Sequence, residues 1–172
     1  VPNSPVLERT TDAVEDLKKF NESDNVSRSV GLRLEMWRTA LTLSEDHIWL
    51  GIGRNGYLDA KKELSAEGKM SEIVLHHTNA HNADIDSLVK RGIFGLLALL
   101  LLFLLPLALF TRALLRSTVE ASPFALAGVM LCTCYMIFGL TTSSLTLNIG
   151  IIMLVFPMVI LWSLLRQQER TA

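Results

Sequence analysis

Charged residues are almost absent from the second half of this 172-residue sequence. Residues 92–172 hold only four of the 16 lysines and arginines and two of the 17 acidic residues, although the net charge of the whole chain is −1. The sequence therefore divides into a polar half and an apolar half. Its 50% hydrophobic content excludes a disordered chain, and it has no basic excess that would neutralise nucleic-acid phosphates.

Cysteines are also few, which excludes a disulfide scaffold. Cys132 and Cys134 lie two residues apart in the apolar half, and we interpret them as small apolar side chains on different faces of a helix. The sequence starts at Val1, and no basic segment or cleavage site indicates a signal peptide. We expect the chain to be a C-terminal piece of a longer protein.

Long uncharged stretches predict three transmembrane helices. Residues 92–111 carry no charge and have the length of about 20 residues that crosses a bilayer as a helix. Residues 121–165 are too long for one crossing, and the polar residues 141–144 mark a break between helices at about 124–140 and 148–165. The predicted fold class is all-α: residues 1–91 form a helical loop, and residues 92–172 form a multi-pass transmembrane region.

The positions of the arginines predict the orientation in the membrane. Arg112 and Arg116 follow the first span, and Arg166 and Arg170 follow the third. Because positive charges favour the cytoplasmic side, residues 1–91 are expected in the periplasm of a Gram-negative bacterium and the C-terminus in the cytoplasm. Lys90 and Arg91, at the outer end of the first span, argue mildly against this orientation.

The polar half is predicted to be helical, without strands or internal repeats. Hydrophobic spacing favours helices at residues 5–20, 27–43, 59–67 and 79–91. The clearest apolar stripe belongs to the second of these helices and consists of Val30, Leu34, Trp37 and Leu41. Gly92 and Gly95, at the start of the first span, are expected to let a neighbouring helix approach closely.

Two motifs in the polar half have more than one interpretation. GIGRNG (residues 51–56) fits the GxGxxG pattern, but no strand precedes it, so a glycine-rich turn is favoured over a nucleotide site. Arg54 and Tyr57 of this segment can still face a ligand. His76, His77 and His81 lack the HExxH pattern and the four ligands of a structural zinc site. Solvated histidines, or a histidine that accepts a proton near pH 7, therefore remain the alternatives.

Arg33 and Trp37 are four residues apart and should share a helix face. A guanidinium beside an apolar stripe either extends to solvent or binds an anion. Arg38 points to another face of the same helix.

Three segments together resemble the O-antigen ligase family: GLRLEMWRTAL, WLGIGRNGY and HTNAHNADIDSLVKRGIFGLL. His81–Asn82, followed by Gly92 and Gly95, matches the His-Asn and Gly-x-x-Gly spacing of that family, and Arg33 with Trp37 matches its arginine-plus-tryptophan motif. The resemblance extends over about residues 27–110.

This resemblance implies a glycosyltransferase of the bacterial inner membrane that needs no metal or nucleotide cofactor. It would transfer a glycan from undecaprenyl diphosphate to the lipid A-core with inversion at the anomeric carbon, and it would bind no nucleic acid. Its partners would be these two lipids, the surrounding membrane lipid and N-terminal transmembrane helices that this sequence lacks. At least one further arginine of the family would lie in those helices, so the isolated chain should be inactive.

The resemblance also assigns roles to residues. Arg33 would stabilise the diphosphate, and His81 would either accept the proton of the attacking hydroxyl or bind the diphosphate as imidazolium. Residues assigned to substrate binding are Trp37, Arg38, Arg54, His77 and Asn82. The alternatives are an O-antigen polymerase, a protein O-oligosaccharide ligase, and a non-catalytic scaffold or sensor. The last would be favoured if Arg33 and His81 lay at opposite ends of the folded loop.

Overall fold

A computed structural model describes residues 10–11, 29–116, 122–146 and 148–171. These residues contain five long α-helices: α2 (Ser29–Glu45), α3 (Gly53–Ala66), α4 (Ala83–Arg116), α5 (Pro123–Gly139) and α6 (Asn148–Thr171). Two short 3₁₀ helices, η1 (Glu72–His76) and η2 (Ser144–Thr146), precede α4 and α6. No strand occurs in the described ranges, which confirms the all-α prediction. The helix expected over residues 5–20 lies outside them, except for residues 10 and 11.

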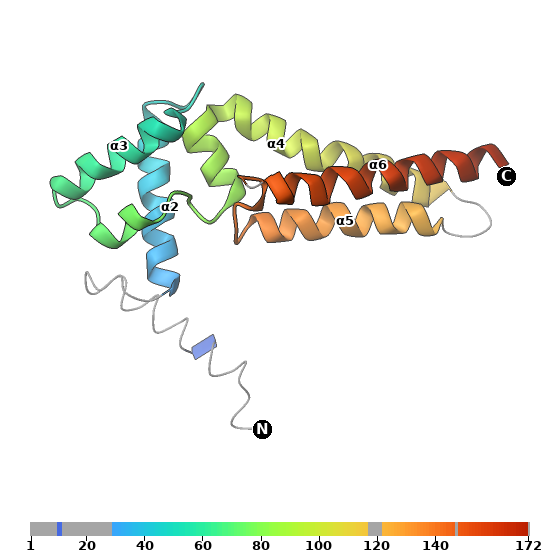
Figure 1. Ribbon diagram of the computed structural model, residues 1–172, viewed down its shortest axis with the longest axis horizontal. Coiled ribbons are helices and arrows are strands. Elements are labelled where there is room, and N and C mark those ends of the chain that lie inside the picture. The colour runs from blue at the N-terminus through green and yellow to red at the C-terminus, as the bar shows by residue number, and fades with distance from the viewer. Residues whose placement is uncertain (1–9, 12–28, 117–121, 147, 172) are drawn as a thin grey trace.

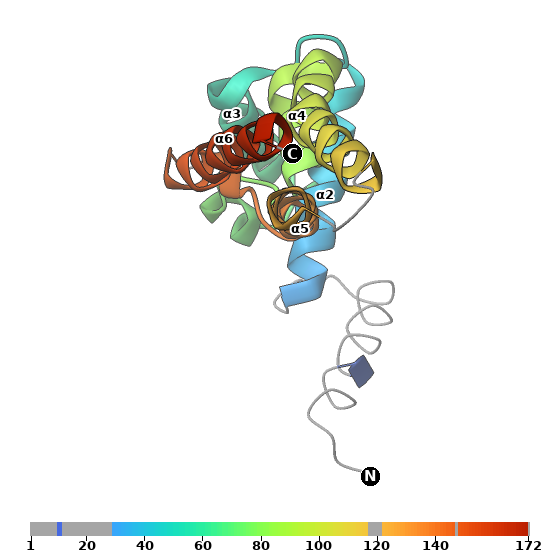
Figure 2. The same cartoon turned by 90° about the vertical axis from the view of Figure 1, so that its right-hand side faces the viewer.

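The helices α4, α5 and α6 lie side by side and form a bundle, and α2 runs across one end of it (Figures 1 and 2). The core of the bundle contains Phe110, Ala125, Cys132 and Leu165. Gly128 of α5 leaves room for the ring of Phe110, because a Cβ there would lie 2.4 Å from its atoms. Cys132 is buried and Cys134 is exposed, as expected for two cysteines on different faces of a helix.

The outer surface of the bundle is apolar. Helices α4 and α6 are long and apolar enough to cross a membrane, and α5 is a shorter apolar helix. Only 11% of each apolar window is buried, whereas the core helix of a soluble protein would be mostly buried. The chain is therefore a helical membrane fragment. The stretches predicted as spans, 92–111, 124–140 and 148–165, fall on α4, α5 and α6, although α4 already begins at Ala83 and α4 and α6 continue to Arg116 and Thr171.

Helix α4 is interrupted at Gly92, where the backbone leaves the helical region (φ 67°, ψ −165°). The turn after α2 enters this interruption: the Ile52 amide donates to the Val89 carbonyl (2.9 Å) and the Ile93 amide donates to the Ile48 carbonyl (2.7 Å). The expectation that Gly92 admits a neighbouring helix was wrong, because the backbone of a turn approaches it. A Cβ on Gly92 would lie 2.2 Å from the carbonyl oxygen of Trp49.

Helix α2 buries a different face from the one that its hydrophobic spacing indicated. Met36 and Ala40 are buried against α3, η1 and the start of α4, whereas Leu41 is 44% exposed. Trp37 packs at the edge of both small cores. The predicted stripe was wrong at Leu41, because η1, α3 and α4 pack against the face that carries Met36 and Ala40, and the other members of the stripe are only half-buried: Val30, Leu34 and Trp37.

Candidate functional site

The two candidate histidines lie in a loop. Residues 77–82, called here the histidine loop, connect η1 to α4, and α4 begins only at Ala83. The prediction of a helix from residue 79 was therefore wrong for residues 79–82. His77 and His81 were expected to share a face only if they were helical, yet the loop itself brings them together.

His77 and His81 contact each other directly. The Nε2 of His81 lies 3.3 Å from the Nδ1 of His77, and the rings meet edge to face with centroids 5.3 Å apart. Burial, followed by the positive charges of His81, Lys61 and His76, lowers the pKa of His77. A neutral His77 can accept a hydrogen bond from the Nε2–H of His81 or donate one from its own Nδ1–H, and this choice fixes the tautomer of His81.

The backbone of His81 adopts an uncommon conformation. Its φ of 51° makes it the one non-glycine residue with positive φ among the residues that the structure describes. Such a conformation is held only where surrounding contacts determine it, and it is enriched at functional sites. The contacts that hold the histidine loop therefore determine where the His81 ring points.

Trp37 joins α2 to the histidine loop. Its indole Nε1 donates to the carbonyl of Ala80, the residue before His81, at 2.9 Å. Arg33 lies one helical turn earlier on α2 and is exposed. The arginine-plus-tryptophan motif and the histidine motif therefore lie on the same side of the folded segment.

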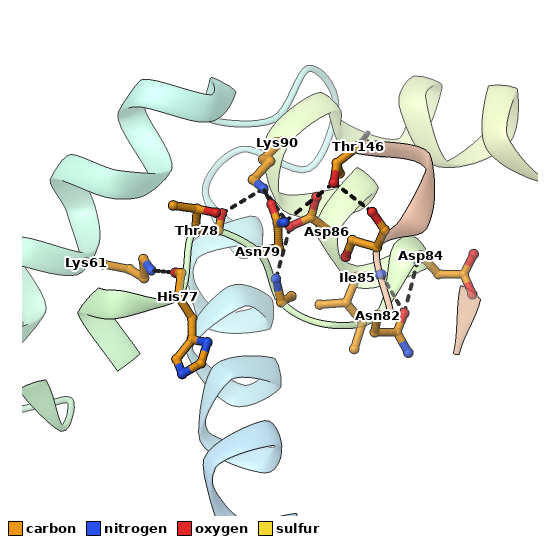
Figure 3. Close-up of polar contacts among 12 residues, drawn as sticks. Lys61, His77, Thr78, Asn79, Asn82, Asp84, Ile85, Asp86, Lys90 and Thr146 are labelled. Carbon is orange, nitrogen blue, oxygen red and sulfur yellow. Dashed lines mark hydrogen bonds and ion pairs between the residues drawn. The ribbon is translucent and has the colours of Figure 1, made fainter. Parts of the chain in front are cut away.

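Asn82 begins α4. Its Oδ1 accepts from the amides of Asp84 (3.0 Å) and Ile85 (3.1 Å), which is the arrangement of a helix N-cap (Figure 3). Its Nδ2 donates to the carbonyl of Leu140, at the end of α5 (3.3 Å). Asn82 therefore fixes the histidine loop against the connection between α5 and α6. Substrate binding by Asn82 stays a prediction.

Two buried lysines hold the histidine loop through its backbone. Lys61 of α3 is 1% exposed and donates to the carbonyls of Val74 (3.1 Å) and His77 (Figure 3). Lys90 of α4 donates to the carbonyl of Thr78 and to the Oδ1 of Asn79, both at 3.0 Å. These bonds order the segment that carries both histidines.

Asp86 supplies the negative charge beside these lysines. Its Oδ1 accepts from Lys90 at 2.6 Å and from the Ala80 amide at 3.0 Å. Both ammonium groups also lie near the ring of Tyr57, with Lys61 Nζ 5.0 Å and Lys90 Nζ 5.3 Å from its centroid. Burial, and after it the positive charge of Lys90, lowers the pKa of Lys61 to about 8. Burial also raises the pKa of Tyr57, which is therefore neutral.

Sequence reasoning missed Lys61, Asp86 and Lys90 as part of the site. From the sequence, Lys90 is only a charge at the end of a span. The four-residue spacing of Asp86 and Lys90 was the available signal, because it places both on one helix face. No local pattern marks Lys61, since its partners lie 13 and 16 residues away.

The three candidate arginines lie at the surface of α2 and α3. Arg33 and Arg38 are exposed on α2, and Arg54 is exposed in the first turn of α3. Arg54 is near enough to Lys90 to affect its pKa. In the part of the chain that the structure describes, these guanidinium groups make no side-chain hydrogen bond or ion pair, so they are available to an anionic ligand.

The described segments contain no cluster of side chains that could bind a metal ion. No three histidine, cysteine, aspartate or glutamate side chains come together there in a way that could hold an ion. His76 ends η1 and is exposed, so it does not extend the His77–His81 pair.

Fold and site define a helical membrane protein in which an extramembrane segment holds a histidine pair at one end of the transmembrane bundle. Residues 4–100, more than half of the chain, match the model of the O-antigen ligase family, and the chain belongs to this family. It is also 27% identical over 149 residues to an uncharacterised protein of Haemophilus influenzae. That alignment covers 87% of this chain but 37% of the relative, so the chain spans well under half of the relative's length.

Proposed function

We propose that this chain is the C-terminal part of an O-antigen ligase, which transfers a glycan from undecaprenyl diphosphate to the lipid A-core. The observation that supports this proposal most is the His77–His81 pair, held in an ordered loop beside the helix that carries Arg33 and Trp37. The reaction is a metal-independent glycosyl transfer, and attack opposite the leaving group inverts the anomeric centre.

In this proposal Arg33 stabilises the leaving group. Departure of the lipid diphosphate builds negative charge on its oxygens, and a guanidinium donates paired hydrogen bonds that strengthen as this charge grows. Arg33 is exposed, and it lies on the helix that contacts Ala80, beside His81. Arg38 and Arg54 are further exposed donors, and Arg54 is near enough to Lys90 to lower its pKa, so we assign both to donor binding.

His81 accepts the proton of the attacking hydroxyl in this proposal. If the Nε2–H of His81 donates to Nδ1 of His77, then Nδ1 of His81 is free to take the proton, and the resulting imidazolium is stabilised by the neutral His77. The acceptor oxygen then bonds to the anomeric carbon as the bond to the diphosphate breaks.

The orientation that we propose places this site on the periplasmic face. The C-terminal ends of α4 and α6 lie at the end of the bundle far from the histidine loop (Figure 1). Arg112, Arg116, Arg166 and Arg170 belong to those ends and favour the cytoplasm. Lys90, which opposed this orientation, is neutralised by its buried pair with Asp86.

Transfer assays with different acceptors test the function. The full-length protein is given an undecaprenyl-diphosphate glycan and lipid A-core, without metal or nucleotide. Core-linked glycan that is lost on Arg33→Ala supports the ligase. Longer lipid-linked chains without core product would instead indicate a polymerase, and transfer only to a protein acceptor would indicate a protein ligase. No product with any acceptor would refute an enzymatic function and favour a scaffold.

A further inference from the structure

The turn between α2 and α3 exposes an apolar surface outside the bundle. Residues 48–50 follow one another without a charge, and their side chains are 39% (Ile48), 67% (Trp49) and 77% (Leu50) exposed. Three consecutive exposed apolar side chains, one of them a tryptophan, are unusual on a water-facing surface. Residues 48–50 are called here the apolar turn.

Two backbone hydrogen bonds and two glycines fix the position of the apolar turn on α4. The amide of Ile93 donates to the carbonyl of Ile48, and the amide of Ile52 donates to the carbonyl of Val89. A Cβ on Gly51 would lie 2.3 Å from the Arg91 amide nitrogen, so the backbones already touch. The turn therefore cannot slide along α4 without breaking these contacts.

The fixed position coincides with the start of the apolar span. Lys90 and Arg91 are the last charged residues before the interruption of α4, and the next charge is Arg112. Just after the interruption Phe94 is 59% exposed, and its ring centroid lies 6.3 Å from that of Trp49. The surface of the turn is thus continuous with exposed apolar residues deeper in the span, Leu97 and Leu101.

The apolar turn also lies on the side of α4 that α5 and α6 do not cover. Figures 1 and 2 both show the α2–α3 connection at the edge of the molecule, on the side of α4 that faces away from α5 and α6. When α4 crosses a bilayer, this turn therefore lies at the level where acyl chains meet headgroups. Tryptophan is enriched at this level because its ring is apolar and its N–H can still find a polar partner.

We propose that Ile48, Trp49 and Leu50, together with Phe94, form a membrane-interface anchor that inserts into the lipid leaflet on the side of the histidine loop. The occupant of this surface is bilayer lipid, because the surface is uncharged and continuous with the span. The anchor and the histidine loop are both bonded to residues 86–93 of α4, so the anchor sets the height of the loop above the acyl chains. This assignment does not depend on the reaction that the protein catalyses.

Depth-dependent quenching of the native tryptophan tests the anchor. The full-length protein and its Trp49→Phe variant are reconstituted in phosphatidylcholine–phosphatidylglycerol vesicles. Part of the phosphatidylcholine is brominated at either the upper or the lower part of the acyl chain. The tryptophan fluorescence of the unsubstituted protein minus that of the Trp49→Phe variant gives the contribution of Trp49 to the emission, called here its share. We expect the shallow bromines to reduce this share roughly twofold or more, and the deep bromines and aqueous acrylamide to reduce it less.

The Trp37→Phe variant is the matched control, because Trp37 is bonded to the histidine loop and its share should respond to neither brominated lipid. A Trp49 share that acrylamide quenches and neither lipid quenches would place the turn in water and overturn the proposal. A share that none of the three reagents quenches would show that protein covers the turn, which overturns it equally. Stronger quenching by the deep bromines would refute the interfacial depth.

Discussion

Replacing Gly92 with alanine should disrupt the junction between the transmembrane bundle and the segment that carries the histidines. The backbone of Gly92, with φ 67° and ψ −165°, lies in a region that is essentially restricted to glycine. A methyl group there would also lie 2.2 Å from the Trp49 oxygen and 2.5 Å from the Leu50 nitrogen. Because both contacts are with backbone atoms, no side-chain rotation relieves them.

The magnitude follows from the two ways in which the variant can respond. Keeping the interruption costs about 1–3 kcal/mol of conformational strain in addition to the clash. Straightening α4 expels the turn and breaks the hydrogen bonds of Ile52 and Ile93, at about 1 kcal/mol each. Because the variant adopts the less costly of these two responses, we expect Gly92→Ala to lower the free energy of unfolding by about 2–3 kcal/mol.

Unfolding of the full-length protein in mixed micelles, followed by circular dichroism, measures this loss. Gly68→Ala is the matched control, because Gly68 has a similar φ of 70° but no atom within 4 Å of its would-be Cβ, so only strain of about 1–2 kcal/mol applies. The Gly51→Ala variant should lose about as much stability as Gly92→Ala. The double variant should lose less than the sum of the two single losses, because both substitutions break the same contact. A Gly92→Ala loss equal to that of Gly68→Ala would refute the reasoning.

Three further predictions concern the residues that hold the histidine loop. The pKa of Lys61 is about 8 in the folded protein, whereas its ordinary value, which applies to the unfolded chain, is 10.5. Between these two pH values the unfolded state therefore binds more protons than the folded state. Stability should therefore rise from pH 8 to 10.5, by about 3 kcal/mol at most, and Lys61→Met should remove that rise in pH-dependent unfolding; an unchanged slope would contradict this. Asn82→Ala should lower stability by about 1 kcal/mol through loss of the cap, measured as a fall in Tm, and Asn82→Asp should recover most of it. Asp86→Asn and Lys90→Met should each cost about 3–5 kcal/mol in chemical unfolding, and the double variant less than their sum; additive losses would show that the pair is not coupled.

The transmembrane architecture could be predicted from the sequence because it depends on local composition. Uncharged stretches located α4, α5 and α6, and the polar residues 141–144 located the break between the last two. The interruption of α4 could not be predicted, because it depends on a turn 40 residues earlier that exchanges backbone hydrogen bonds with it. The sequence shows this contact only through the glycines at its two sides, Gly51 and Gly92, and neither glycine by itself indicates which segment it contacts.

The candidate site was predictable only in part. Two signals indicated the site: the spacing of Arg33 and Trp37, and the resemblance at His81 and Asn82. The structure joins the two segments that carry them through the Trp37–Ala80 hydrogen bond. The role of Lys61 was not predictable, because charged side chains are normally exposed and its partners are carbonyl groups that the fold brings near, whereas the spacing of Asp86 and Lys90 offered a signal only for that pair.

The most direct test of the proposed function is the effect of His81→Ala on transfer and on donor binding, measured separately in the full-length protein. His47→Ala, at an exposed histidine in the turn after α2, is the control. We predict that His81→Ala lowers the transfer rate by about 10²–10⁴-fold and leaves the affinity for the undecaprenyl-diphosphate glycan nearly unchanged. The His47→Ala variant should retain full transfer. Transfer by His81→Ala at the rate of His47→Ala would contradict the account.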